Sequence, residues 1–342
     1  MKRIIYFVLI LVISILACKE KSEKPVAEKE VLVIDTTNIK PIKLDESFFL
    51  VYDLPNNSVL RYKLITYNKN SQTFYLDSTI SGWVEQNVEY IFKVSVKDKE
   101  QNGNMTLDIL CEQIKAEAKS STGETLTFNS QKPPTDSLEK LQTKNFEILV
   151  NTDFSARISP QGEVLDVFKS ENFIEKLIQE APRKPSEEEK IAIKNDFEQG
   201  VLKPIVQQLF KSLTEKKVNV DSLWTITYPT QLSVFDIENT ATYKIDKVFE
   251  SGKTKLVEIT GTLTIKPSGK TEHTENNVVY KFSKPKAKGV GKYYYDLNKK
   301  LIRKAESDVT FELAVNISQK GQTKTYKRVD VIQTNNSLIL LD

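Results

Sequence analysis

The feature that most constrains this chain is an alternation of apolar and polar residues with a period of two. The clearest example starts at Met105, where Met105, Leu107 and Ile109 alternate with Thr106 and Asp108. Successive side chains of a strand point to opposite faces, so this pattern is typical of a strand with one buried face. The alternation fills two separate stretches of the sequence and predicts a protein built mainly from β-sheet.

Similar segments predict further strands in both stretches. They are Val59 to Tyr67, Glu89 to Val96, Met105 to Ile114, Thr242 to Phe249, Lys255 to Ile265, Val278 to Phe282, Thr310 to Ile317 and Lys324 to Ile332. Short turn signals separate them at Asn56-Asn57, Asn102-Gly103-Asn104, Pro160-Gln161-Gly162, Ser251-Gly252 and Ser268-Gly269. Strands joined by short turns favour antiparallel pairing.

One block between these stretches has helical periodicity. Phe173, Ile174, Leu177 and Ile178 share one helical face, and Pro182 ends that segment. A second helix is expected after Ser186, which forms a capping-box pattern with Glu189.

We expect this second helix to break at Gly200. A third helix is expected from Pro204, with Ile205, Leu209 and Leu213 on its apolar side. The chain order is therefore strands, about three helices, and strands again.

These patterns predict an α+β protein with a curved, mainly antiparallel sheet and about three central helices packed on it. A faint echo between Phe146–Val167, expected as strands around a turn, and Tyr293–Val309 leaves two arrangements open: one half-barrel or two similar lobes. The predicted segments are a signal peptide (1–17), a lipidated N-terminus and tether (18–46), an N-terminal β half (47–168), a helical segment (169–217) and a C-terminal β half (218–342).

The N-terminus has the order of a signal peptide. Lys2 and Arg3 precede an apolar run from Ile4 to Ala17, and Cys18 follows. A bilayer span needs about 20 apolar residues, so this run is too short for an ordinary transmembrane helix. The alternative to a lipoprotein signal is a secretory signal with a chance cysteine.

The end of the run, Ile15-Leu16-Ala17-Cys18, resembles the lipobox of bacterial lipoproteins. The resemblance implies that Cys18 carries a diacylglycerol and anchors the chain to a membrane. Residue 19 is Lys rather than Asp, which by the same resemblance suggests the outer membrane, facing either the periplasm or the cell surface. Two or three acyl chains at one position give stable anchoring.

Composition excludes several classes of site. The formal net charge is +3, and it falls to about +1 when Lys2 and Arg3 leave with the signal peptide, so no nucleic-acid partner is predicted. His273 is the one histidine of the sequence, which excludes metal sites that need two. Two cysteines cannot form a disulfide framework. We predict no metal and no cofactor.

Candidates for chemistry are few. Cys111 lies on the apolar side of a predicted strand, where a buried thiol is unreactive. His273 lies in a polar hairpin and is expected to be solvated. Gly289 and Gly291 fail the phosphate-loop pattern and are expected to allow close packing beside Tyr293. We predict no catalytic residue.

Two longer segments resemble an uncharacterised family of Bacteroidetes-type bacterial lipoproteins. They are NFEILVNTDFSARISPQGEVLDV and KGVGKYYYDLNKKLIRKAESD. The lipidated cysteine, long strands and central helices are also similar to lipoprotein carriers of the LolA, LolB and LppX type. In those folds a curved sheet wraps helices around an apolar cavity, so the resemblance implies an apolar ligand.

The sequence therefore predicts a non-enzymatic lipoprotein of the cell envelope that binds or carries an apolar or amphipathic ligand, such as a lipid, between sheet and helices. The alternative is a structural or protein-interaction lipoprotein of the outer membrane with an unknown protein partner. A hydrolase that uses two carboxylates ranks last, because no spacing in the sequence nominates such a pair.

Overall fold

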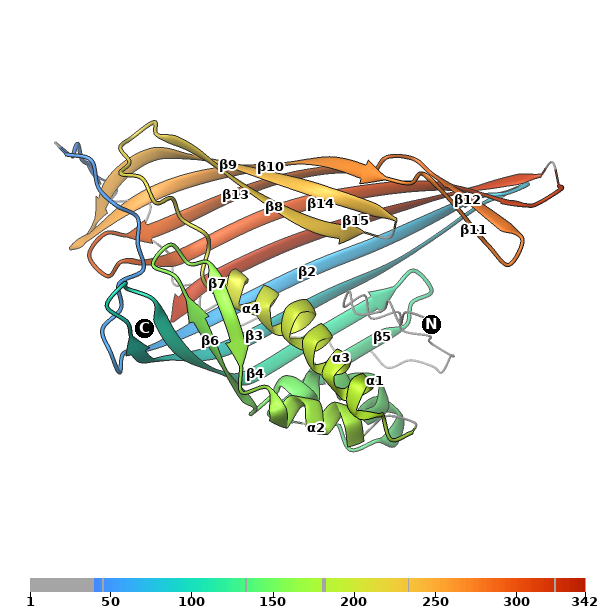
Figure 1. Cartoon of the computed structure of the whole chain (residues 1–342), viewed down its shortest axis with the longest axis horizontal. Coiled ribbons are helices and arrows are strands. Elements are labelled where there is room, and N and C mark those ends of the chain that lie inside the picture. The colour runs from blue at the N-terminus through green and yellow to red at the C-terminus, as the bar shows by residue number, and fades with distance from the viewer. Residues whose placement is uncertain are drawn as a thin grey trace.

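The computed structural model describes residues 40–44, 46–132, 134–179, 183–232, 234–322 and 324–341. They form one open antiparallel sheet of 15 strands, with helices on one side of it (Figure 1). The strands are β1 (Lys40–Pro41), β2 (Val59–Tyr75), β3 (Thr79–Lys99), β4 (Met105–Ser120), β5 (Thr125–Asn129), β6 (Asp153–Ile158), β7 (Val164–Phe168), β8 (Leu223–Leu232), β9 (Phe235–Ser251), β10 (Thr254–Gly269), β11 (Glu272–Glu275), β12 (Val278–Phe282), β13 (Lys286–Asp296), β14 (Leu301–Gln319) and β15 (Thr325–Leu341). The helices are α1 (Ser137–Leu149), α2 (Glu171–Gln179), α3 (Glu187–Phe197), the π-helical turn η1 (Glu198–Leu202) and α4 (Lys203–Leu209).

The two β-rich parts of the sequence belong to the same sheet. Its main path runs β1-β9-β10-β13-β14-β15-β2-β3-β4-β6-β7, while β8, β5 and the β11–β12 hairpin pair alongside. The join is the pairing of the last strand, β15, with the first long strand, β2, from Leu341 opposite Arg61 to Lys327 opposite Tyr75.

The sheet has an inner face, which the helices cover at one end. Ile259, Tyr293, Ala305, Leu338 and Leu64 are paired in series across five strands and belong to the main hydrophobic core, so they mark the inner face. We call the end where β2 begins the base, and the end where β2 turns into β3 the tip. In Figure 1 the long strands extend past the helices toward the tip.

The helices close the base by packing large side chains against the inner face. Phe173, Leu202 and Phe210 are fully buried in the same core as Tyr52 and Tyr62. The ring of Phe210 meets that of Tyr52 edge to face, with centroids 5.3 Å apart. Burial of these rings holds the helical block on the sheet.

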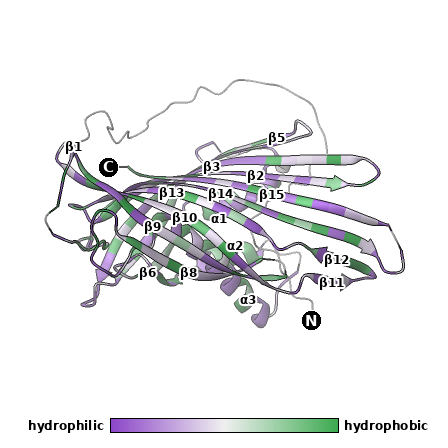
Figure 2. Ribbon diagram, turned by 90° about the horizontal axis from the view of Figure 1, so that it is seen from above, coloured by the Kyte–Doolittle hydropathy of each residue, from purple (hydrophilic) through white to green (hydrophobic). Residues whose placement is uncertain are grey.

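The opposite, outer face is polar and charged. Lys63 and Glu89 form an ion pair at 2.8 Å, and Lys69 lies 3.6 Å from Glu85 and 4.7 Å from the ring centroid of Trp83. Figure 2 shows hydrophilic and hydrophobic segments alternating along the strands. This alternation explains why the strands could be recognised in the sequence.

The predicted fold class is confirmed, and the helical block holds the predicted helices. Gly200, however, does not break the second helix: it lies in η1, which links α3 to α4 without interruption. Around Gly200 the helix continues as a π-helical turn instead of ending. Glu198 of this turn is buried, and it accepts a hydrogen bond from the hydroxyl of Ser170 at 2.5 Å. Among the described residues, no helix is both long and apolar enough to cross a bilayer.

A further helix, α1, was missed in the sequence. The segment from Phe146 was expected to be a strand, because Phe146, Ile148 and Val150 alternate with polar or aliphatic neighbours. Instead Phe146 and Leu149 lie one helical turn apart on α1 and are buried, and Phe146 stacks on Phe128 with ring centroids 5.3 Å apart. A short run of apolar residues is compatible with both the strand period of 2 and the helix period of 3.6. The stacking of Phe146 on Phe128 of β5 stabilises the helix.

The capping box of α3 is present as predicted. The Glu189 N–H donates to Ser186 Oγ at 3.2 Å, and the Ser186 N–H donates to Glu189 Oε2 at 2.8 Å. We expect Ser186→Ala to lower the free energy of unfolding by about 1 kcal/mol, because one N–H of the first turn loses its acceptor. Urea unfolding measures the change.

Glu189→Gln is the matched control, since a Gln side chain can still accept from the Ser186 N–H. It should cost less than Ser186→Ala. A larger loss in Glu189→Gln would show that the ion pair of Glu189 with Arg183, at 2.5 Å, matters more than the cap.

Candidate functional site

Toward the tip, the inner face carries an apolar column beside a largely polar one. The apolar column on β14 consists of Val309, Phe311, Leu313 and Val315. Their paired residues on β15 are, in the same order, Thr334, Ile332, Asp330 and Arg328. Side chains paired across two strands share a face, so the inner face is amphipathic here.

The polar side continues onto β2. We define the inner polar ladder as Asn68 and Asn70 of β2 with Thr334, Asp330 and Arg328 of β15. Thr334 is paired with Asn68 and donates from its hydroxyl to Asn68 Oδ1 at 2.8 Å. Arg328 Nε donates to Asp330 Oδ2 at 3.0 Å.

Two side-chain oxygens of the inner polar ladder accept no hydrogen bond from the residues that the structure describes. Within the described part of the chain, Oδ1 of Asn70 and Oδ1 of Asp330 are buried and have no hydrogen-bond partner. Buried polar atoms are normally paired, because an unpaired one costs free energy. Each oxygen therefore has an unused acceptor site.

Two residues of the apolar column, Phe311 and Leu313, belong to a second hydrophobic cluster that contains only strand and turn residues. Phe235 and Ile237 of β9 pack with Leu313, and Phe282 of β12 lies against them. The ring centroids of Phe235 and Phe282 are 6.2 Å apart, although β9 and β12 are not paired in the sheet. The sheet must therefore curl toward its inner face at the tip.

A group of aromatic rings separates this region from the base. Trp224 stacks on Tyr243 with centroids 5.4 Å apart, and Tyr243 lies 6.0 Å from Tyr293. These rings lie over glycines: a Cβ on Gly261 would be 3.0 Å from the Tyr243 ring, and one on Gly291 would be 2.7 Å from Tyr293 Oη. Burial raises the pKa of both tyrosines, so both stay neutral.

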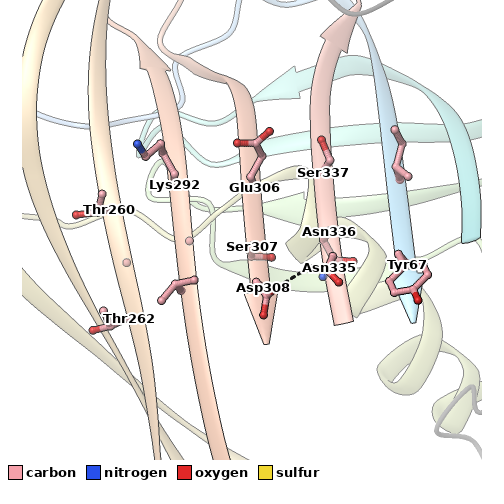
Figure 3. A pocket seen from close by; sticks show the side chains of 14 residues that line it. Tyr67, Thr260, Thr262, Lys292, Glu306, Ser307, Asp308, Asn335, Asn336 and Ser337 are labelled. Carbon is pink, nitrogen blue, oxygen red and sulfur yellow. Dashed lines mark hydrogen bonds between the residues drawn. The ribbon is translucent and has the colours of Figure 1, made fainter. Parts of the chain in front are cut away.

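The outer face has a groove of its own, with a volume of about 610 Å³ (Figure 3). It is lined by Tyr67 of β2, Thr260 of β10, Val290 and Lys292 of β13, Glu306 of β14 and Asn335 of β15. Their register places these side chains opposite to the core residues of the same strands.

Several polar groups of this groove already have partners. Asn335 Nδ2 donates to Asp308 Oδ2 at 2.5 Å, and Tyr67 Oη donates to Glu85 Oε2 at 3.1 Å. Lys292 lies 3.3 Å from Glu258. These polar groups of the groove are therefore already paired within the protein, whereas the inner polar ladder has two oxygens without a hydrogen-bond partner in the described chain.

A smaller hollow of about 260 Å³ lies between α2 and the start of β6. Lys176 Nζ donates there to Thr152 Oγ1 at 2.6 Å. Among the described residues, no three His, Cys, Asp or Glu side chains gather in a way that could hold a metal ion.

The residues singled out in the sequence do not come together. Cys18, predicted to be lipidated, lies outside the described residues. Cys111 is 2% exposed, and burial raises the pKa of its thiol to about 12, so it is protonated and unreactive at neutral pH. His273 is exposed on β11, 4.0 Å from Glu275. Gly291 lies against Tyr293 as predicted, whereas Gly289 allows close packing with Leu263, whose Cβ would lie 2.8 Å from a Cβ at residue 289.

The inner polar ladder was missed in the sequence. Asn68 and Asn70 follow the predicted strand Val59 to Tyr67, at positions where the alternation of apolar residues stops. Asp330 and Arg328 gave no local signal, because they alternate with Val329 and Val331 and so have the pattern of residues on a polar face. The pairing of β15 with β14 instead places them on the inner face, opposite Leu313 and Val315.

Comparison with known proteins gives a family but no activity. The model of a family of unknown function, DUF6263, matches residues 102–302. A comparison with curated proteins found no match.

Two solved structures illustrate the structural likeness. A structure described as lipid–protein interactions in lipovitellin is similar over 84% of this chain at 14% identity, with a TM-score of 0.46, and this chain spans 25% of that chain. The outer membrane protein OpdK from Pseudomonas aeruginosa is similar over 81% of this chain and 98% of its own, at 8% identity and a TM-score of 0.17. Likenesses of this size carry no argument about function.

Proposed function

The chain belongs to DUF6263, a family of unknown function, and from the geometry of its inner face we propose that it is a non-enzymatic lipoprotein of the cell envelope that holds an amphipathic ligand. The expected membership of an uncharacterised family is thereby confirmed. The carrier role implied by the resemblance to LolA, LolB and LppX is part of the proposal, as are the acyl anchor at Cys18 and the outer-membrane location.

One observation carries the proposal: the apolar column on β14 lies directly beside the inner polar ladder. An acyl chain against Val309 and Phe311, the two half-buried residues of the column, would lose contact with water, which stabilises binding by about 0.8 kcal/mol per buried CH₂. The polar end of the same molecule would meet the free oxygens of Asn70 and Asp330. A ligand with both kinds of group fits this surface better than a purely apolar one.

The position of the helices suggests where such a ligand would lie. Side chains of the helical block, such as Leu202 and Phe210, are fully buried against the base. The second hydrophobic cluster contains strand and turn residues only. We therefore place the ligand next to the helices, on the inner face toward the tip.

Binding of a fluorescent fatty acid to the full chain tests this proposal, with native mass spectrometry to detect co-purified lipid. Val309→Asn should weaken binding about tenfold, because it puts an amide in the apolar column. Val290→Asn is the matched control: Val290 lies on the adjacent strand but on the outer face, where it is 61% exposed. That variant should bind like the natural chain.

Thermal unfolding of both variants shows whether each remains folded. The proposal fails if the natural chain neither binds the fatty acid nor carries lipid. It also fails if Val290→Asn weakens binding as much as Val309→Asn does.

A further inference from the structure

The end of the β2–β3 hairpin exposes apolar side chains on both faces of the sheet. Tyr75 is 45% exposed, Leu76 44% and Ile80 56%. Tyr75 lies on the outer face, Ile80 lies on the inner face opposite Phe74, and Leu76 lies in the turn between the strands. We call these three residues the apolar tip.

This composition is not explained by packing within the described chain. A strand of an antiparallel sheet needs apolar residues on the face that it buries, and its solvent face is usually polar. Single exposed apolar residues are common, but a cluster at the end of a projection marks a contact surface. In Figure 1 this end of the sheet points away from the helices.

Lysines surround the apolar tip. Lys327 is paired with Tyr75, and its Nζ lies 5.5 Å from the centroid of the Tyr75 ring. Lys324 lies 2.8 Å from Asp77, the one acidic residue of the β2–β3 turn, and Lys320 is exposed in the adjacent β14–β15 turn. Glu275 belongs to β11, which reaches β14 only through β12. Next to the apolar tip, positive charge is therefore in excess.

We propose that the apolar tip docks on the surface of a membrane that contains anionic phospholipids. Leu76 and Ile80 would enter the boundary between headgroups and acyl chains, and Tyr75 would lie at headgroup level, where aromatic rings with a polar end are favoured. The lysines would lie among the phosphates, with their alkyl stems along the apolar residues. This geometry fits a bilayer, which is apolar below a layer of negative charge.

Docking in this orientation would bring the tip end of the inner face to the bilayer. A ligand could then pass between the membrane and the apolar column on β14. That consequence rests on the proposed function, whereas the docking itself does not.

A fluorescent label in the turn tests the docking directly. The full chain with Cys18→Ser and Ser78→Cys has one reactive thiol among the described residues, because Cys111 is buried. An environment-sensitive dye on Ser78→Cys should shift to the blue with vesicles of phosphatidylcholine and phosphatidylglycerol. The shift should be much weaker with phosphatidylcholine alone, and added salt should reduce it. The label reports on the apolar tip however the N-terminus associates with the vesicle.

Two controls make the result specific. The same dye on Lys253→Cys, in the β9–β10 turn at the base, should not shift. Leu76→Ser with Ile80→Ser should weaken the response of the tip label about tenfold. Val59→Ser with Val290→Ser, at residues 53% and 61% exposed elsewhere on the sheet, should leave it unchanged.

The proposal is wrong if the tip label does not respond to anionic vesicles, or if its response survives Leu76→Ser with Ile80→Ser. Fatty-acid binding by Leu76→Ser alone, which changes a residue of the turn and none of the inner face, should match the natural chain. Failure of the docking can thus be told apart from failure of the proposed ligand binding.

Discussion

Gly162→Ala is expected to lower the free energy of unfolding by about 3–5 kcal/mol, the largest effect of any single methyl group that we predict. Gly162 lies in the turn between β6 and β7 with φ of +79°, a region that residues with a Cβ rarely adopt. A Cβ there would be 2.6 Å from Cε2 of Tyr52 and 2.7 Å from the carbonyl oxygen of Lys211. Neither neighbour can move freely, because Tyr52 is buried and donates to that same carbonyl at 3.0 Å.

Gly123→Ala is the matched control for this prediction. Gly123 has a similar φ of +88°, but a Cβ there would meet nothing within 4 Å. It should lose only about 1 kcal/mol, the backbone part of the cost. Urea unfolding of the two variants measures both values. Equal losses would show that the contact of the β6–β7 turn with Tyr52 does not hold the base together.

The second large effect is a loss of stability in alkali, between pH 10 and 12. Burial raises the pKa of Tyr295 to about 12 and that of Tyr294 to about 12, from an ordinary value of 10.0. It also raises the pKa of Tyr52, Tyr62 and Tyr90. Above pH 10 the unfolded chain releases phenol protons that the folded chain keeps, so the free energy of unfolding falls with pH.

The loss should be large because each pKa unit is worth about 1.4 kcal/mol. Titration of Tyr294 and Tyr295 should together lower the free energy of unfolding by about 5 kcal/mol at pH 12, and the other buried tyrosines should lower it further. Lys211 acts in the opposite direction. Burial lowers its pKa to about 8 from an ordinary value of 10.5, so between these pH values the unfolded chain binds a proton that the folded chain has released, and the free energy of unfolding rises with pH. A shallow rise in stability should therefore precede the steep fall.

Urea unfolding at several pH values, with tyrosinate absorbance recorded in parallel, tests this profile. Tyr295→Phe keeps the ring and removes the ionisable group. Between pH 10 and 12, the free energy of unfolding of this variant should fall by about 2 kcal/mol less than that of the natural chain. Titration of all the tyrosines near pH 10 in a chain that is still folded would contradict the prediction.

Much of the sheet could be predicted from sequence, but the predicted strands were shorter than those of the structure. The alternation ended at Tyr67, whereas β2 continues to Tyr75, and β3 begins at Thr79 rather than Glu89. Near the base, the inner positions are apolar because helices cover them. Toward the tip, Asn68 and Asn70 occupy the same inner phase, so the pattern that indicates a strand disappears. The candidate site lies where the local signal is weakest.

The helices, too, were predicted correctly only where the signal lies within a few residues. Ser186 and Glu189 form their capping box within four residues, so the start of α3 could be predicted from sequence. The break expected at Gly200 was wrong, since neighbours far along the chain, such as Ser170, stabilise the turn around Glu198. The missed helix α1 likewise depends on a contact between Phe146 and Phe128.

The period-two alternation was enough to predict an antiparallel sheet with one buried face, and the helical periodicity was enough to predict a helical block between two β-rich parts. These properties depend on neighbours within a few residues, which the sequence displays directly. The pairing of β15 with β2 could be seen only in the folded chain. It merges both parts into one sheet and brings Asp330 and Thr334 near Asn70 and Asn68. That pairing joins residues more than 250 positions apart, and no local pattern encodes which strands meet.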